Sequence, residues 1–142
     1  MILRLSFLIV FCTFSIIGES QVWTGNVDSE WENGANWQSG SVPSNGDDIV
    51  IDSSTSYSGA KVHPIITSTS SFIPNKLTIK NGSQLRITGS SAQLIVSGKD
   101  VTIDNNYATG YTSSLTIDNR GFLSILADKK LKVKKGGEIH LT

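Results

Sequence analysis

Three tryptophans near the start of the chain are the side chains best suited to bind a ligand. Trp23, Trp31 and Trp37 fall within fifteen residues and are the only tryptophans in the sequence. An exposed aromatic cluster marks a binding surface, with sugar rings as one class of ligand, whereas a buried cluster closes an apolar core. We expect these rings to form a structural cap, with a carbohydrate-binding platform as the alternative.

Carboxylates offer a second kind of chemistry. Asp47, Asp48 and Asp52 lie close together in the sequence, and carboxylate oxygens are the ligands that Ca²⁺ prefers. The sequence has neither the spacing of an EF-hand loop nor that of a calcium-binding nonapeptide repeat. These three aspartates are therefore a weak calcium candidate, and we expect no metal site and no cofactor.

A pair of aspartates could serve catalysis, because glycoside hydrolysis needs two carboxyl groups about 5–10 Å apart. Asp104 and Asp118 end two similar motifs, VTID and LTID, so they could lie near each other on adjacent coils. The simpler interpretation is that both begin turns. His63 and His140 lie in no ligand-spaced motif, and no nucleophile elbow is present. We expect no catalytic residues and no enzymatic activity.

Charge and composition narrow the classes of partner. The chain has 142 residues, with 12 Lys and Arg against 12 Asp and Glu. A net charge of zero gives no general field for nucleic acid. The distribution is uneven, because all eleven Lys and Arg beyond Arg4 follow Ala60. Five lysines crowd the C-terminal part, which indicates solvated strands and turns or, alternatively, a patch for an acidic polymer. They are Lys129, Lys130, Lys132, Lys134 and Lys135.

Residues 1–20 have the pattern of a secretory signal peptide. Arg4 precedes the apolar stretch LSFLIVFCTFSII, and the small residues Gly18 and Ser20 predict cleavage before Gln21. The only cysteine, Cys12, would leave with this segment. We expect an extracellular or cell-surface protein without disulfides and without a membrane span after cleavage.

Repetition in the second half of the chain predicts the fold. Residues 77–87 and 115–125 share six of eleven positions at an offset of 38, and short apolar-x-apolar segments follow each. That alternation is typical of strands with one buried face, and Asn and Gly mark the corners between them. The sequence predicts an all-β fold, a right-handed parallel β-helix of four-strand repeat units with a Trp-rich N-terminal cap. The alternative is an antiparallel β-sandwich.

The domain organisation follows from these segments. We expect a signal peptide over 1–20, a cap and first strand over 21–52, and solenoid coils over 53–142. Repeat proteins need about three or more units and polar ends, whereas the final strand-like segment, Ile139–Leu141, has no polar cap after it. We therefore expect incomplete coils at the C-terminus, belonging to a longer protein or covered by self-association.

The tryptophan segment also resembles a known class of proteins. The pattern W-x-G, D-x-x-W, N-W-x-x-G-x-V-P and D-D-I-V-I is similar to the N-terminal block of large bacterial secreted β-helix proteins of the autotransporter and adhesin type. The matching residues are Trp23, Gly25, Asp28, Trp31, Asn36, Trp37, Gly40, Val42, Pro43, Asp47, Asp48 and Ile51.

This resemblance implies a structural or adhesive surface module, with glycans or a surface protein as partners. The alternative function is a scaffold fragment of a polysaccharide-active β-helix enzyme, or a carbohydrate-binding module.

Overall fold

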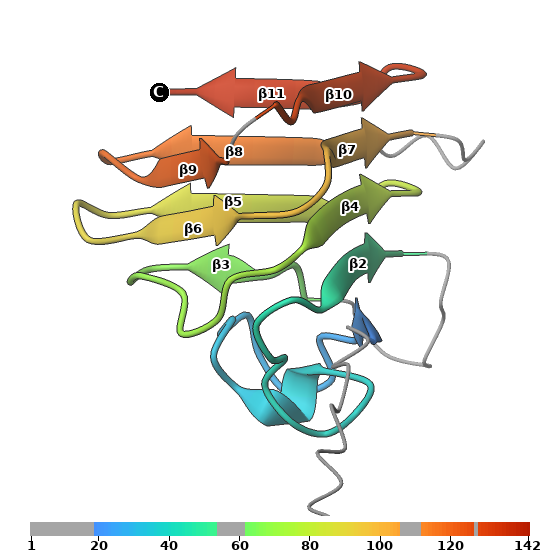
Figure 1. The fold of residues 1–142 in the computed structure, drawn as a ribbon, viewed down its shortest axis with the longest axis vertical. Helices are drawn as coiled ribbons and strands as arrows, with labels where there is room; N and C mark the ends of the chain where they lie inside the picture. The colour runs from blue at the N-terminus through green and yellow to red at the C-terminus, as the bar shows by residue number, and fades with distance from the viewer. Residues whose placement is uncertain (1–18, 54–61, 106–111, 127) are drawn as a thin grey trace, which may run out of the picture.

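The protein is a parallel β-solenoid (Figure 1). The computed structural model describes residues 19–53, 62–105, 112–126 and 128–142. Their strands wind upward as a right-handed coil of about four turns, and one short 3₁₀ turn, η1 (Gly34–Asn36), is the helical element among them. Within these residues, no helix has the length and apolar character needed to cross a membrane. The predicted parallel β-helix is confirmed.

Strands of four or five residues make up most of the coil, and β3 has two. The first three are β1 (Ser20–Trp23), β2 (Asp48–Asp52) and β3 (Ile65–Ile66). The middle coils contain β4 (Lys76–Lys80), β5 (Gln84–Thr88), β6 (Gln93–Val96) and β7 (Val101–Asp104). The last coils contain β8 (Ser114–Asp118), β9 (Phe122–Ile125), β10 (Leu131–Lys134) and β11 (Glu138–Leu141).

Three sheets enclose the core. The largest has the order β1-β2-β4-β7-β10, the second has β11-β8-β5-β3, and the third pairs β6 with β9. All pairings between these strands are parallel, so the antiparallel β-sandwich alternative is wrong. The predicted signal peptide lies outside the described residues except for Glu19 and Ser20, and Ser20 begins β1.

Inward side chains form ladders that continue from coil to coil. In the first sheet, Leu77 is in register with Val101, which is in register with Leu131. Because each strand alternates its side chains between the two faces, the apolar residues at every second position meet inside the coil. Leu77 and Val101 are completely buried, and complete burial of such a side chain stabilises the fold by roughly 1.5–3 kcal/mol.

The repeat found in the sequence is not the coil that stacks, and this part of the prediction is wrong. Register partners are separated by 24 residues between Leu77 and Val101 and by 30 between Leu85 and Leu115, not by 38. The offset of 38 relates β4 to β8, which belong to different sheets. Each middle coil holds three strands rather than four, so the shared LTI motif reflects a common strand environment, not stacking.

Turns between strands use the left-handed backbone conformation. Asn81 follows β4 with φ 57° and Asn119 follows β8 with φ 48°. Asparagine tolerates this conformation better than most residues, which explains its place at the corners. At Gly121 an added Cβ would lie 2.4 Å from the carbonyl oxygen of Ile87, so this corner requires glycine because the coil below approaches closely.

Candidate functional site

The three tryptophans meet at one end of the solenoid, as the cap prediction requires. Trp23 and Trp31 are stacked with ring centroids 6.1 Å apart, and Trp37 meets both edge-on at 5.1 and 4.9 Å. Phe72 adds a fourth ring, stacked on Trp31 at 5.5 Å. Both arrangements are preferred by aromatic pairs and stabilise them beyond their burial. Sequence reasoning missed Phe72, since it lies 35 residues beyond Trp37.

Every indole N–H of this aromatic cluster has an internal acceptor. Trp23 Nε1 donates to the carbonyl oxygen of Val62 at 2.8 Å, and Trp31 Nε1 donates to Ser70 Oγ at 3.1 Å. Trp37 Nε1 donates to the carbonyl oxygen of Trp31 at 3.1 Å. Satisfied donors fix the orientation of each ring, because leaving a buried N–H without a partner is costly.

Burial argues against the carbohydrate platform. Trp23, Trp31 and Trp37 are only 4%, 1% and 2% exposed. A sugar ring needs an open aromatic face, and none of the three rings offers one in this structure. The cluster instead covers the first coils, and its packing in this structure is that of a cap.

A buried asparagine organises the loop that carries the tryptophans. Asn36 is completely buried, and its Oδ1 accepts hydrogen bonds from the backbone N–H groups of Val27 and Asp28. Its amide donates to Asp28 Oδ1 at 2.5 Å and to the carbonyl oxygen of Glu30 at 3.1 Å. The Asn36 amide, the Glu30 N–H and the Asn33 amide all donate to Asp28 and together lower the pKa of this carboxyl group.

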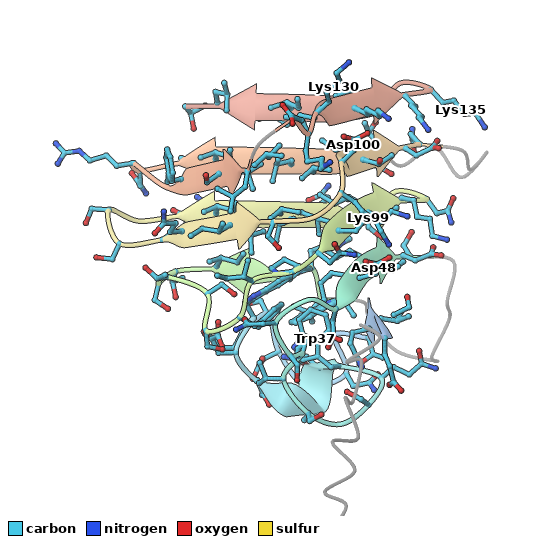
Figure 2. All side chains as sticks on the ribbon, viewed as in Figure 1. Trp37, Asp48, Lys99, Asp100, Lys130 and Lys135 are labelled. Carbon is cyan, nitrogen blue, oxygen red and sulfur yellow. The ribbon has the colours of Figure 1, made fainter. Side chains whose placement is uncertain are left out.

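The three aspartates of the calcium candidate serve three separate interactions. Asp47 accepts hydrogen bonds from the backbone N–H groups of Glu19 and Ser44. Asp48 lies 3.0 Å from the Lys99 ammonium group, and the two are neighbours in Figure 2.

The third, Asp52, lies 3.0 Å from Lys80 Nζ and accepts from the Asn81 amide. In the described part of the chain no three metal-ligating side chains come together, so the calcium candidate does not form a site in this structure.

The proposed catalytic pair is also separated. Asp104 ends β7 and Asp118 ends β8, and these two strands point to opposite sides of the molecule (Figure 1). The Thr88 hydroxyl group and Arg86, whose Nη2 lies 2.6 Å from Asp118, lower the pKa of this carboxyl group. A lowered pKa suits an ionised structural carboxylate rather than a general acid. The expectation that these two carboxylates lie near each other on adjacent coils is therefore wrong.

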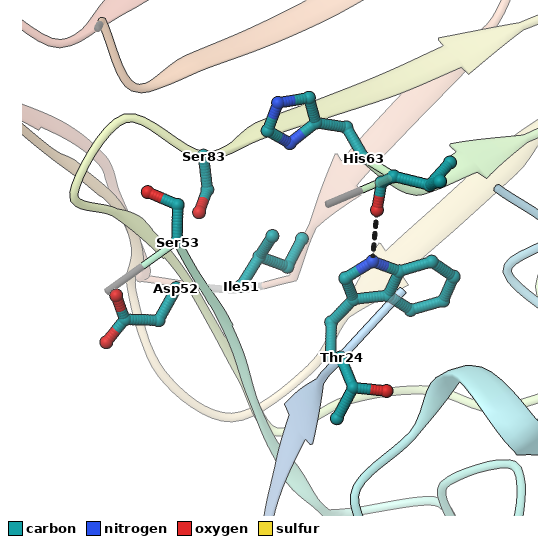
Figure 3. Close-up of a pocket in the computed structure, with 8 residues that line it drawn as sticks. Thr24, Ile51, Asp52, Ser53, His63 and Ser83 are labelled. Carbon is teal, nitrogen blue, oxygen red and sulfur yellow. Dashed lines mark hydrogen bonds between the residues drawn. The ribbon is translucent and has the colours of Figure 1, made fainter. Parts of the chain in front are cut away.

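A small cavity lies beside the cap, and His63, Ser83 and Asp52 are among the residues that line it (Figure 3). Its volume is about 10 Å³, which is room for about one water molecule. His63 Nδ1 accepts a hydrogen bond from the Gln84 N–H at 3.2 Å, and Asp52 is engaged by Lys80. A cavity of this size has no room for a substrate.

The opposite end of the solenoid is open. Leu131 and Val133 of β10 continue the inward ladders but are 36% and 44% exposed. Ile139 and Leu141 of β11 are 37% and 72% exposed. Val101 N–H donates to the carbonyl oxygen of Lys130. The backbone N–H and C=O groups of Lys130, Lys132 and Lys134 therefore face β7. The N–H groups of Leu131 and Val133 therefore point to the open side of the sheet.

Comparison with known sequences finds a family match over the part of the chain that contains the aromatic cap. Residues 22–105 match a family described as "Domain of unknown function (DUF8693)". The chain belongs to this family. The match begins in β1 and ends after β7, so a DUF8693 domain comprises the aromatic cap together with the first coils. No curated protein and no solved structure matches the chain.

The DUF8693 boundaries separate two kinds of surface. The aromatic cluster and the buried Asn36 lie inside the matched region, whereas β10 and β11, with their exposed inward residues, lie beyond it. The candidate functional features are therefore the closed end, which belongs to the family domain, and the open end, which this chain carries after it.

Proposed function

We propose that this protein is a structural module that starts a secreted β-solenoid. The aromatic cap closes the core at one end, and the open end presents β10 and β11 as the foundation for further β-structure. The difference in burial between the two ends carries this proposal. Leu77 is completely buried, whereas Leu131, in the same inward ladder, is 36% exposed.

The cellular setting of the proposal comes from the sequence. The charged start, the apolar stretch and the small residues before Gln21 support export, and the cap pattern resembles bacterial adhesin-type surface proteins. We infer a secreted or cell-surface module of adhesin-like architecture, a part of a larger assembly rather than an enzyme. The separation of Asp104 from Asp118 supports a non-catalytic role.

Export can be tested directly with the full-length chain. After expression in a bacterial host, we expect the secreted product to begin at Gln21 when its N-terminus is sequenced. A Ser20→Phe variant is the matched control, because signal peptidase requires a small residue at this position and cleavage should stop. A product that keeps residues 1–20 in the absence of that substitution would contradict the proposed export.

The open end can be tested by extending the chain by one coil segment. The Thr142 N–H donates to the carbonyl oxygen of Ile117. Thr142 therefore stacks over Asp118, which is in register with Thr88 on the coil below. The extension is a copy of residues 89–104 attached after Thr142, in which the copied Asp100 and Asp104 are replaced by asparagine. It supplies two uncharged strands that can pair with β9 and β10.

If the open end accepts β-structure, backbone exchange at Leu131 and Val133 should slow in the extended chain. Unchanged exchange at both residues would mean that this end does not continue the solenoid. The same extension with proline at the copied Thr102 position is the control, because the N–H of that residue would face β10 and proline cannot donate to a ladder.

A further inference from the structure

The outer face of the largest sheet carries an alternating charge pattern that the function proposed above does not require. Asp52 of β2 is in register with Lys80 of β4, Lys80 with Asp104 of β7, and Asp104 with Lys134 of β10. Acid and base therefore alternate along one column through four successive coils.

A second column at the other end of the strands repeats the alternation. Asp48 is in register with Lys76. Asp100 and Lys130 immediately precede the paired residues Val101 and Leu131 and continue this column. The successive strand segments read DIVID, KLTIK, DVTID and KLKVK, so each rung has the opposite charge to its neighbours.

Side-chain contacts between rungs use these charges. Lys80 Nζ lies 3.0 Å from Asp52, and Lys132 forms an ion pair with Asp100 on the rung below it. The Lys130 backbone N–H also donates to Asp100 at 2.8 Å, and these two residues occupy neighbouring levels in Figure 2. The Lys132 side chain and the Lys130 N–H lower the pKa of Asp100, so this carboxylate stays ionised between the lysine rungs.

The alternation of charge ends at β10, whose lysines lie along an exposed edge of the sheet. Lys130, Lys132 and Lys134 are exposed along β10, and the open N–H groups of Leu131 and Val133 lie beside them. Directly opposed like charges destabilise a strand pair, whereas opposite charges stabilise it. The free edge therefore discriminates among strands by charge.

We propose that the open end binds a parallel β-strand of the pattern acid–apolar–x–apolar–acid, presented by a further solenoid coil. Its acids would lie in register with Lys130 and Lys134, and its apolar residues would cover Leu131 and Val133. This inference rests on the proposed function and adds a rule for which coil is accepted. Two strands of this chain, DIVID and DVTID, already have the pattern and pair with lysine rungs.

A second copy of this chain fits the edge less well. Two β10 strands facing each other across a two-fold axis would bring Lys132 against its own counterpart. A head-to-tail copy would present β1, and the four residues Ser20–Trp23 hold no acid. Neither arrangement satisfies the lysines.

Spacing along the chain sets the length of the test segment. Asp100 follows Thr88 by twelve residues, and Lys130 follows Asp118 by the same number. Thr88, Asp118 and Thr142 stack on successive coils. A copy of residues 89–104 attached after Thr142 therefore places its DVTID segment directly over β10. The copied β6 strand would then lie over β9.

The experiment compares three extended chains that differ only in the two rung residues of the copy. The acidic version keeps both aspartates, the neutral version has asparagines and the basic version has lysines. Exchange at Leu131 and Val133 is measured residue by residue by NMR. We expect exchange in the acidic version to be at least about tenfold slower than in the basic version, with the neutral version between them. The difference should shrink in 1 M salt, where the Debye length is about 3 Å.

The outcomes separate the charge rule from the proposed function. Equal protection in all three versions would overturn the charge rule and leave the structural role intact. No protection in any version would overturn both. A dimer of the unextended chain with protected Leu131 and Val133 would replace the proposed coil with a second copy. Protection of the unextended chain by heparin would identify an acidic polymer as the occupant instead.

Discussion

The two ends of the solenoid are built from similar strands but differ in what covers them. At the closed end, Ile49 and Ile51 of β2 are 0% and 1% exposed. At the open end, Leu131 and Val133 occupy the same two inward ladders and are 36% and 44% exposed. The apolar-x-apolar pattern is the same in both strands. Burial is therefore decided by the neighbouring coil and the aromatic cap, not by the pattern.

This difference divides the molecule into a closed half, next to the aromatic cap, and an open half, next to β10 and β11. The closed end satisfies its donors internally, as the three indole N–H groups show. The open end leaves both apolar side chains and backbone donors toward solvent, which is how an edge strand recruits another strand. Stability should therefore be concentrated near the cap, and binding capacity near β10.

The largest expected effect comes from breaking the aromatic cap. Trp31→Ala removes a ring that is 1% exposed and packs against Trp23, Trp37 and Phe72. We expect a loss of about 3–5 kcal/mol in the free energy of unfolding, measured by denaturant titration. Phe122→Ala is the aromatic control, because Phe122 is 54% exposed and its loss should cost far less. Equal losses in the two variants would contradict the cap.

A matched pair of leucines measures the difference between the ends within one ladder. Leu77→Ala should cost about 2–5 kcal/mol, because this side chain is completely buried. Leu131→Ala should cost about 1 kcal/mol, because its open side has no packing partners to lose. Denaturant midpoints with unchanged slopes would give both values. If the acidic coil extension covers β10, the cost of Leu131→Ala should rise toward that of Leu77→Ala.

Removing the polar centre of the cap loop should have the next largest effect. Asn36→Ala leaves the backbone N–H groups of Val27 and Asp28 without their acceptor inside the loop. The expected loss is about 1–3 kcal/mol in the free energy of unfolding. Asn33→Ala is the comparison, because Asn33 lies nearer the surface and makes only two side-chain hydrogen bonds in this loop, donating to Asp28 and accepting from the Ala35 N–H. A loss no larger than that of Asn33→Ala would mean that Asn36 does not organise the loop.

The general architecture could be predicted from sequence because its signals are local. Alternating apolar residues, asparagine and glycine corners and clustered tryptophans each indicate their own structure within a few residues. Sequence reasoning failed where distant segments had to be matched. The LTI motif fits any strand with one buried face, so the repeat at 38 residues could not identify the stacking partner.

A better signal for register was present in the charges. The segments DIVID, KLTIK, DVTID and KLKVK alternate in the order in which their strands stack, since opposite charges favour adjacent rungs. Phe72 and the role of Asn36 could not be found in this way. Their contacts depend on how the cap loop folds over the first coils, which no short-range pattern encodes.

Acid should weaken the closed end through Asp28. Its pKa is lowered from an ordinary value of 3.8 by hydrogen bonds from Asn36, Glu30 and Asn33. A carboxyl group with a depressed folded-state pKa stabilises the protein above its ordinary pKa, and this stability is lost as the pH falls through the lowered value. Asp28→Asn should therefore lower Tm at pH 5–7, and the difference from the unmodified chain should shrink as the pH falls below 3.8.

The smallest expected effect comes from a substitution at a corner of the open half, after β8. Arg120 adopts φ 67°, a left-handed conformation that costs most residues about 1–2 kcal/mol, whereas glycine adopts it freely. Glycine also gains flexibility in the unfolded chain, which offsets part of the relief. We expect Arg120→Gly to raise the free energy of unfolding by about 0.5 kcal/mol, with Arg120→Ala giving no gain. Equal effects would mean that the corner relaxes at little cost, because one edge of the last coil is open and its backbone can adjust.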